Sequence, residues 1–152
     1  SKLDIKDLER ARQVDGGILT AMSTDITPFT SRGGKLLMYH GWADTALTPL
    51  MSVDYYDKAT QKNGASTPEF MRLFMVPGMF HCRGGVGVDR IDALTPLLNW
   101  VEGGTAPARI VAHRVEGGKV ARSRPLCPYP EVARYNGSGS LDAAESFSCR
   151  KP

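Results

Sequence analysis

The sequence predicts an α/β fold in which parallel strands are joined by crossover helices. Two observations carry this prediction. Short apolar runs at residues 35–40 and 70–76 are bounded by turn-forming residues, as is typical of strands buried on both faces of a parallel sheet. A segment with apolar residues at helical spacing follows each run, at 49–63 and 88–104. With a further strand near 109–115, the order strand, helix, strand, helix, strand indicates parallel pairing through right-handed crossovers.

Length and composition favour one globular domain and exclude several other classes of protein. The chain has 152 residues, of which 41% are hydrophobic and 23% charged, and no apolar run reaches the length of a membrane span. The net charge is only +3, and the one modest basic cluster, Lys119, Arg122 and Arg124, is interpreted as a solvated strand edge. We therefore expect neither nucleic acid nor a membrane as a partner. The polar N-terminus lacks the apolar core of a secretory signal, so any targeting segment is expected outside this chain.

The first half of the chain divides into a lead-in and the start of the core. Residues 1–22 show mild helical spacing up to Gly16 and Gly17, and a loop rich in proline, glycine and hydroxyl residues follows. These residues form a predicted lead-in over 1–32. The strand at 35–40 lies between glycines, and the helix at 49–63 begins after a proline and ends at Gly64. A core of strands and helices is predicted over 33–124.

The second half continues the core and ends in a tail. The second strand stops at Pro77, and the helical stripe within 88–104 ends at Gly103 and Gly104. Pro96 must either kink this helix or occupy the first turn of a shorter helix that begins near Thr95. Residues 109–124 are predicted as two short strands around a turn at 116–118. The tail, 125–152, is rich in Pro, Gly and Ser and is expected to wrap over the surface.

Two ionisable residues follow the two predicted strands of the core. Asp44 follows the first strand and His81 the second, and reactive groups of parallel sheets gather in the loops at the carboxyl ends of strands. An acid followed by a histidine is also the chain order of the last two members of a Ser-Asp-His triad. In such a triad the carboxylate orients the imidazole, which acts as general base. The alternative is that Asp44 caps a turn or helix and His81 is an ordinary loop residue.

Other side chains near this pair have two interpretations each. His40 and Trp42 either contact a substrate or serve as a hydrogen-bonded strand-end histidine and a packed core aromatic. His113 falls in a predicted strand and receives no role. A metal site using His40, His81 and Cys82 is the rival chemistry, but paired ligand spacing is lacking. The sequence therefore predicts no metal in this chain.

Five motifs in fixed order resemble one known family. They are HGWAD (40–44), PLMSVDYY (49–56), RLFMVPGMFHC (72–82), NWVEGGTAP (99–107) and RPLCPYP (124–130). Together they resemble the tannase and feruloyl esterase family over about residues 33–149. The resemblance implies an α/β-hydrolase fold and a Ser-His-Asp carboxylic ester hydrolase, with Asp44 and His81 completing the triad. Its substrates would be small esters of aromatic acids, of the galloyl or feruloyl type.

The resemblance also implies that other parts of the enzyme lie outside this sequence. In the family the nucleophilic serine stands N-terminal to HGWAD on a G-x-S-x-G-like elbow, and a lid domain lies between the two. No G-x-S-x-G occurs here, so the chain corresponds to the C-terminal part, with the N-terminal part of the same enzyme as its partner. Calcium in some relatives belongs to the lid, so no cofactor is expected in this chain. The alternative is a noncatalytic fragment or subunit that only binds or completes a partner chain.

The three cysteines give an odd count, which leaves one without a partner in this chain if two of them pair. The resemblance implies that Cys82 forms a disulfide with a cysteine that precedes the serine, outside this chain. It also implies that Cys127 and Cys149 pair and close the tail, whereas two free buried thiols are the alternative. A disulfide framework of this kind predicts a secreted or periplasmic protein.

Overall fold

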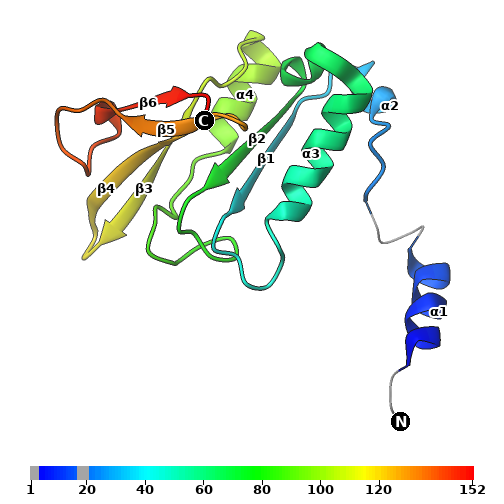
Figure 1. Ribbon diagram of the computed structural model, residues 1–152. Coiled ribbons are helices and arrows are strands. Elements are labelled where there is room, and N and C mark those ends of the chain that lie inside the picture. Colours follow the sequence, from blue (N-terminus) through cyan, green and yellow to red (C-terminus); the bar gives the residue numbers. More distant parts are fainter. Residues whose placement is uncertain (1–3, 17–20) are drawn as a thin grey trace.

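The computed structural model describes residues 4–16 and 21–152, and its alternation of strands and helices confirms the α/β class (Figure 1). Leu3 and residues 17–20 of the predicted lead-in lie outside the described residues. The elements follow this order: α1 (Ile5–Asp15), α2 (Thr27–Thr30), β1 (Leu36–Gly41), α3 (Leu50–Asn63), η1 (Gly64–Glu69), β2 (Met71–Val76), α4 (Leu94–Gly103), β3 (Ile110–Glu116), β4 (Lys119–Leu126), β5 (Val132–Tyr135), η2 (Ala144–Ser146) and β6 (Phe147–Arg150).

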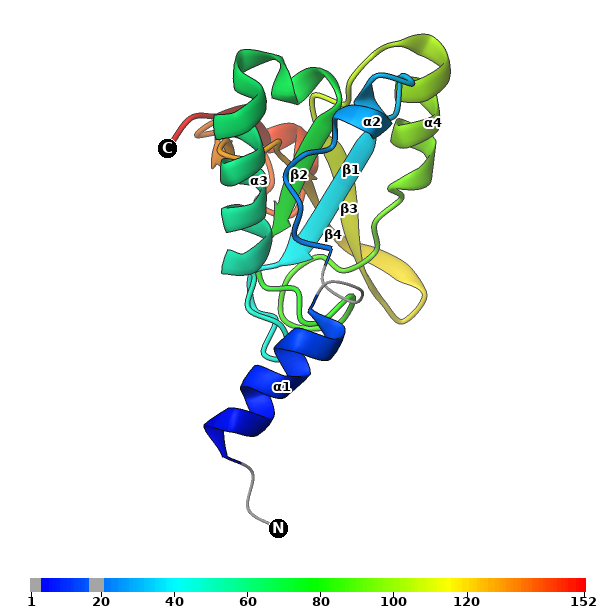
Figure 2. The ribbon, with the colours of Figure 1, turned by 90° about the vertical axis from the view of Figure 1, so that its right-hand side faces the viewer.

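The central feature is the parallel pair β1 and β2. Their register runs from Leu36 opposite Met71 to Gly41 opposite Val76, so the two strands end at the same level. Helix α3 connects them, and Figure 2 shows α3 and α4 on opposite sides of the pair. The predicted strand, crossover helix and parallel strand are confirmed for this unit.

The core lies on both faces of β2, because successive side chains of a strand point to opposite faces. One cluster joins alternate residues of β2 to α3: Met71, Leu73, Met75, Tyr56 and Ala59. The other joins the remaining apolar residues of β2 to the two strands that follow: Phe74, Val76, Ile110, Ala112 and Leu126. Burial on both faces explains why the run in the sequence is apolar at every position except Arg72.

The prediction that the third strand continues the parallel sheet is wrong. Strand β3 pairs antiparallel with β4, which confirms the two strands predicted around a turn at 116–118, and the described residues form three separate two-stranded sheets. The physical reason is the turn at Gly117 and Gly118, whose φ angles of 55° and 77° suit a tight hairpin between neighbouring strands. The segment after β4 flanks β2 instead, and the Tyr129 amide donates to the Leu73 carbonyl at 2.7 Å.

The second predicted helix is shorter than its apolar stripe. Helix α4 begins at Leu94, and Pro96 lies in its first turn, where a missing N–H costs no helical hydrogen bond. This is the second of the two alternatives that the sequence left for Pro96. Helix α1 is capped by the Asp4 side chain and has no buried residue. None of the helices in the described ranges is long and apolar enough to span a membrane.

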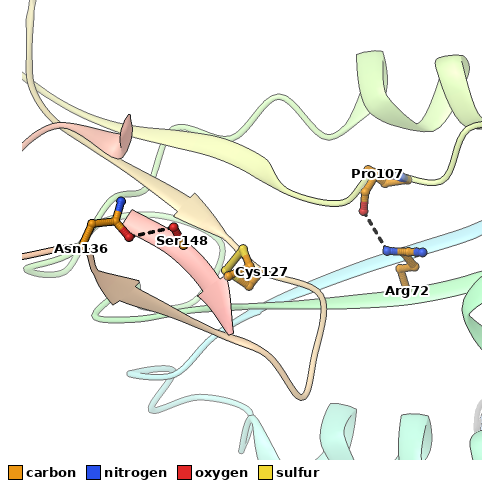
Figure 3. Close-up of a disulfide and its surroundings, with 6 residues drawn as sticks. Arg72, Pro107, Cys127, Asn136 and Ser148 are labelled. Carbon is orange, nitrogen blue, oxygen red and sulfur yellow. Dashed lines mark hydrogen bonds between the residues drawn. A yellow bond between two sulfur atoms is a disulfide. The ribbon is translucent and has the colours of Figure 1, made fainter. Parts of the chain in front are cut away.

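The tail contains more regular structure than its composition predicts. Strands β5 and β6 form an antiparallel hairpin, and a disulfide joins Cys127 to Cys149 across 22 positions (Figure 3). This is the pairing that the resemblance implies. A cross-link that closes a loop of this length stabilises the fold by about 3 kcal/mol in the chain-entropy model. Beside it, the Ser148 hydroxyl donates to the Asn136 side-chain carbonyl at 2.7 Å.

Candidate active site

Strands β1 and β2 end at the same level, so the two loops that follow them are in direct contact. The Trp42 amide donates to the Val76 carbonyl at 2.9 Å, and the Ala43 amide donates to the Met79 carbonyl at 3.1 Å. We call residues 42–47 the acid loop and residues 77–90 the histidine loop. The bond from Ala43 to Met79 joins the two loops, and the bond from Trp42 to Val76 attaches the acid loop to the end of β2, so together they fix the distance between the side chains that the loops carry.

Asp44 is held within the acid loop by its own backbone neighbours. Its Oδ1 atom accepts hydrogen bonds from the amides of Ala46 at 2.8 Å and Leu47 at 2.9 Å. This is the capping role expected as an alternative to catalysis, and it arises because aspartate readily bonds amides two or three residues ahead. The Asp44 side chain is only 2% exposed.

The second carboxylate oxygen of Asp44 faces His81. The His81 Nδ1 atom lies 2.8 Å from Asp44 Oδ2, so the structure brings the two predicted residues together. Hydrogen bonding holds the pKa of Asp44 well below its usual range. The main cause is the Leu47 amide, with further contributions from His81, Ala46 and His40 that outweigh desolvation. An ionised carboxylate only accepts hydrogen bonds, so His81 carries its proton on Nδ1.

The His81 side chain is exposed, with its second nitrogen, Nε2, on the far side of the ring from Nδ1. Its side chain is 52% exposed, and no hydrogen bond to Nε2 occurs in the part of the chain that the structure describes. An imidazole with Nδ1–H on a carboxylate and an available Nε2 lone pair is arranged to accept a proton. The ring borders a pocket of about 270 Å³ lined by Tyr39, His40, Gly41, Asp44, Leu47, Met79, His81 and Cys82.

Glycines allow the histidine loop to turn back on itself. Gly78, Gly84 and Gly85 all have positive φ, and the Phe80 amide donates to the Gly84 carbonyl at 3.2 Å. A Cβ on Gly85 would meet the Gly78 carbonyl oxygen. Cys82 has a φ of 62°, the one positive value outside glycine in the described ranges, which is a strained conformation for a side chain of its size.

Arg114, which is distant in the sequence, also supports the histidine loop through hydrogen bonds. Arg114, on β3, donates from Nη1 to the Gly85 carbonyl at 2.6 Å and to the Gly87 carbonyl at 3.2 Å. Asp89 adds a contact within the loop, since its Oδ2 accepts from the Gly84 amide at 2.8 Å. Sequence reasoning missed Arg114, because nothing in the motifs links it to a loop almost 30 residues earlier.

His40 lies beside the acid and uses both ring nitrogens. Its Nε2 is 3.0 Å from Asp44 Oδ2, and its Nδ1 is 2.7 Å from the Ser52 hydroxyl. The His40 side chain is 16% exposed. The geometry is that of the hydrogen-bonded strand-end histidine, one of its two predicted interpretations. Ser52 was missed, although PLMSVDYY contains it.

Trp42 lies away from the pair. It is 42% exposed and lines a different cavity of about 360 Å³, together with Cys127 and Tyr129. Cys82 is exposed and unpaired within the described residues. Over residues 4–16 and 21–152 no group of three or more His, Cys, Asp or Glu side chains is arranged to hold a metal ion.

Comparisons with known proteins give a consistent result. A family model described as tannase and feruloyl esterase matches residues 5–150. The chain is 49% identical to the mono(2-hydroxyethyl) terephthalate hydrolase of Piscinibacter sakaiensis over 87% of this chain and 22% of that protein. It is 35% identical to a probable feruloyl esterase of Arthroderma benhamiae over 99% of this chain and 28% of that protein.

A solved structure gives the same answer for the fold. The crystal structure of an esterase from Aspergillus oryzae superposes with a TM-score of 0.85 and 28% identity, covering 98% of this chain and 34% of that one. The chain thus spans between about a fifth and a third of the length of the proteins that it matches.

Proposed function

The chain belongs to the tannase and feruloyl esterase family, and we propose that it supplies the acid and the base of a serine carboxylic ester hydrolase. One observation carries this proposal: Asp44 and His81 meet at 2.8 Å, at the carboxyl ends of two parallel strands. Asp44 would orient the imidazole and His81 would act as general base and then general acid. The names of the relatives, a hydrolase of a terephthalate ester and feruloyl esterases, support ester hydrolysis.

The chemistry would follow the two steps of acyl transfer. His81 Nε2 takes the proton of a serine hydroxyl while the serine oxygen attacks the ester carbonyl carbon. The protonated imidazole, stabilised by the Asp44 carboxylate, then gives that proton to the departing alcohol. In the second step His81 accepts a proton from water, the resulting hydroxide oxygen attacks the acyl carbon, and the serine leaves with its proton restored.

The serine itself is proposed to lie outside this chain. The sequence has no G-x-S-x-G, and the chain spans only part of the length of its relatives. We propose that residues 1–152 are the C-terminal part of an α/β-hydrolase domain, with a lead-in over 1–32, a core over 33–124 and a disulfide-closed tail over 125–152. The nucleophile, the oxyanion hole and the lid belong to the remainder of the enzyme.

Cys82 is proposed to join the two parts covalently. It is exposed, it directly follows His81, and its strained backbone points to an external constraint on this turn. A disulfide from Cys82 to a cysteine near the nucleophile would fix the separation of base and serine. With the disulfide between Cys127 and Cys149, this pairing supports a secreted or periplasmic location.

Esters of aromatic acids are the proposed substrates. Terephthalate and feruloyl, the acyl groups named for two of the relatives, both carry an aromatic ring on the acid side of the ester. Phe80 and Tyr39 are exposed aromatic residues beside His81 and in its pocket lining, where they offer ring surfaces to such an acyl group. No cofactor is required by this mechanism.

Two substitutions test the proposal: Asp44→Asn and His81→Gln, each made in the intact protein that contains this segment. Their kinetics are measured with methyl ferulate, methyl gallate and mono(2-hydroxyethyl) terephthalate. Each should lower kcat by about 10⁴-fold, the loss usual when the acid of a Ser-His-Asp triad becomes its amide. His113→Gln, on β3, is the matched control and should retain activity. The 152-residue chain alone should be inactive. Full activity of either site variant would show that this segment has no catalytic role.

A further inference from the structure

We propose that His40 is a positioning residue that tunes His81 through Asp44, and that Ser52 stabilises the tautomer of His40 that donates to Asp44. The inference rests on the proposed roles of Asp44 and His81. It gives functions to two polar residues that the triad does not use. They are connected in one line of hydrogen bonds, from Ser52 on α3 through His40 on β1 to Asp44 in the acid loop and His81 in the histidine loop.

The Asp44 carboxylate is fully occupied by donors. Oδ1 takes the amides of Ala46 and Leu47, and Oδ2 takes one nitrogen from each of His40 and His81. A carboxylate offers about four lone-pair sites, and each of them here has one donor. The two histidines therefore share a single oxygen, so whatever His40 donates to Oδ2 reduces the negative charge available to His81.

The tautomer of His40 follows from its two neighbours. An ionised carboxylate cannot donate, so the contact of 3.0 Å requires a proton on His40 Nε2. In the neutral ring Nδ1 then carries a lone pair, which accepts the Ser52 hydroxyl at 2.7 Å. The opposite tautomer would set the Nε2 lone pair against the carboxylate. The Asp44 carboxylate thus selects the ring form, and the Ser52 hydroxyl, which can donate or accept, stabilises that form by donating to Nδ1.

Few other charges reach this group. The titratable side chains around the Asp44 carboxylate in its pocket are His40 and Tyr39 from β1 and His81 and Cys82 from the histidine loop. Helix α3 contributes the Ser52 hydroxyl, which carries no charge. A neighbouring pocket that shares Tyr39 and Cys82 with this one is lined by further ionisable residues: Arg83, Asp89, Arg90, Asp92 and His113. The negative charge seen by His81 is consequently set by Asp44 and by what His40 donates to it.

The consequence is a measurable effect on the base. Without the His40 donor, more negative charge resides on Oδ2, and the protonated form of His81 is stabilised. Because the base must be unprotonated to act, the acid limb of the kcat/KM profile should move to higher pH by about half a unit to one unit, the size expected from one hydrogen bond. The Nδ1–H proton resonance of His81 should move downfield as its bond to Oδ2 strengthens.

Two amide substitutions separate this role from simple packing. In His40→Gln the side-chain amide can occupy the position of Nε2 and still donate to Asp44, whereas the shorter amide of His40→Asn corresponds to Nδ1 and faces Ser52. In the intact protein we expect His40→Gln to keep the wild-type pH profile and proton resonance. His40→Asn should show both shifts and be less active than the wild type over the pH range of the acid limb. His113→Asn is the control and should show neither.

Ser52→Ala completes the test. It should give a smaller shift in the same direction, and it should have no further effect in the His40→Gln background, since the glutamine has no Nδ1 for the Ser52 hydroxyl to donate to. Equal behaviour of His40→Gln and His40→Asn, or an additive effect of Ser52→Ala, would overturn the proposal. The proton resonance of His81 is measured without substrate, so this test does not depend on the proposed function. A protein that hydrolyses no aromatic ester would refute the proposed function, and the resonance would still decide the role of His40. If one His40 variant does not fold, Ser52→Ala alone tests the proposal. Shifts of both the acid limb and the His81 proton resonance would support it, and the absence of both would overturn it.

Discussion

The acid loop and the histidine loop touch each other but are built in opposite ways. The acid loop is held by contacts within a few positions, since Asp44 Oδ1 bonds the amides of Ala46 and Leu47. The histidine loop depends on glycines with positive φ and on Arg114, which reaches it from β3. A loop stabilised by neighbouring residues forms wherever its short motif occurs, whereas the other needs the rest of the fold in place.

Exposure differs between the two ionisable side chains that the loops carry. The Asp44 side chain is 2% exposed and has all its bonds made, while His81 is 52% exposed with one nitrogen open. A buried carboxylate with all its acceptor sites used has a fixed position, whereas an exposed imidazole is accessible to other molecules. We expect the site to be most sensitive where the two loops are joined and less sensitive at the outer supports of the histidine loop.

Gly41→Ala alters the contact between the end of β1 and the histidine loop, and of the three substitutions in this section it should lower kcat most. A Cβ on Gly41 would meet the carbonyl oxygens of Met79 and Phe80, so the two loops must separate. A displacement near 1 Å between Asp44 and His81 should lower kcat about 100-fold in the intact protein. Gly103→Ala, at the end of α4 with open space around it, is the control. Unchanged kinetics in Gly41→Ala would mean that the loops do not hold each other.

Cys82→Ser removes the proposed covalent support of the histidine loop and should have an intermediate effect. The loop keeps its internal bonds, so we expect kcat to fall on the order of tenfold, through misplacement of His81 relative to the serine. Peptide mapping of the unreduced protein should find Cys82 linked to a cysteine outside residues 1–152. Reduction should lower the activity of the wild type but not that of Cys82→Ser. A free Cys82 thiol in the active protein would contradict this support.

Arg114→Met should have the smallest effect of the three. It removes the two bonds to the carbonyls of Gly85 and Gly87 while keeping the length of the side chain. We expect a loss of about threefold in kcat/KM, since the turn is still closed by its own backbone bonds and water replaces in part the two lost hydrogen bonds.

Hydrogen exchange distinguishes this loss from general destabilisation. In Arg114→Met the amides of the histidine loop should exchange faster, while those of Ala46 and Leu47 keep their protection. Arg122→Met on β4, which removes an exposed ion pair with Asp142, is the matched control. Faster exchange in both loops alike would show that Arg114 supports the whole fold and not the histidine loop.

Much of the fold was predictable because its signals are local. Strand β2 and helix α3 lie within a residue or so of their predicted bounds, since an apolar run and a proline-to-glycine interval mark them directly. The two strands around the turn at 116–118 were predicted and confirmed, whereas the parallel pairing of the third strand with the core, inferred from strand order alone, was wrong. The hairpin of the tail was missed, since its short strands carry little apolar pattern.

Asp44 and His81 could be singled out from their places after two strands, and family motifs then gave them roles that remain proposals. Their meeting at 2.8 Å needed the register of β1 against β2. The supports could not be predicted, because Ser52 reaches the site from a helix and Arg114 from a later strand.

The sequence by itself determined the order of the elements, the apolar faces of β2 and α3, and the acid loop, because each depends on residues close together in the chain. Only the tertiary structure decided that β3 and β4 form a sheet separate from the parallel pair, how Arg114 supports the histidine loop, and that two histidines share one carboxylate oxygen. Those features arise from packing between distant segments. The energy of such contacts exists only after the chain has folded, so short sequence patterns do not record it.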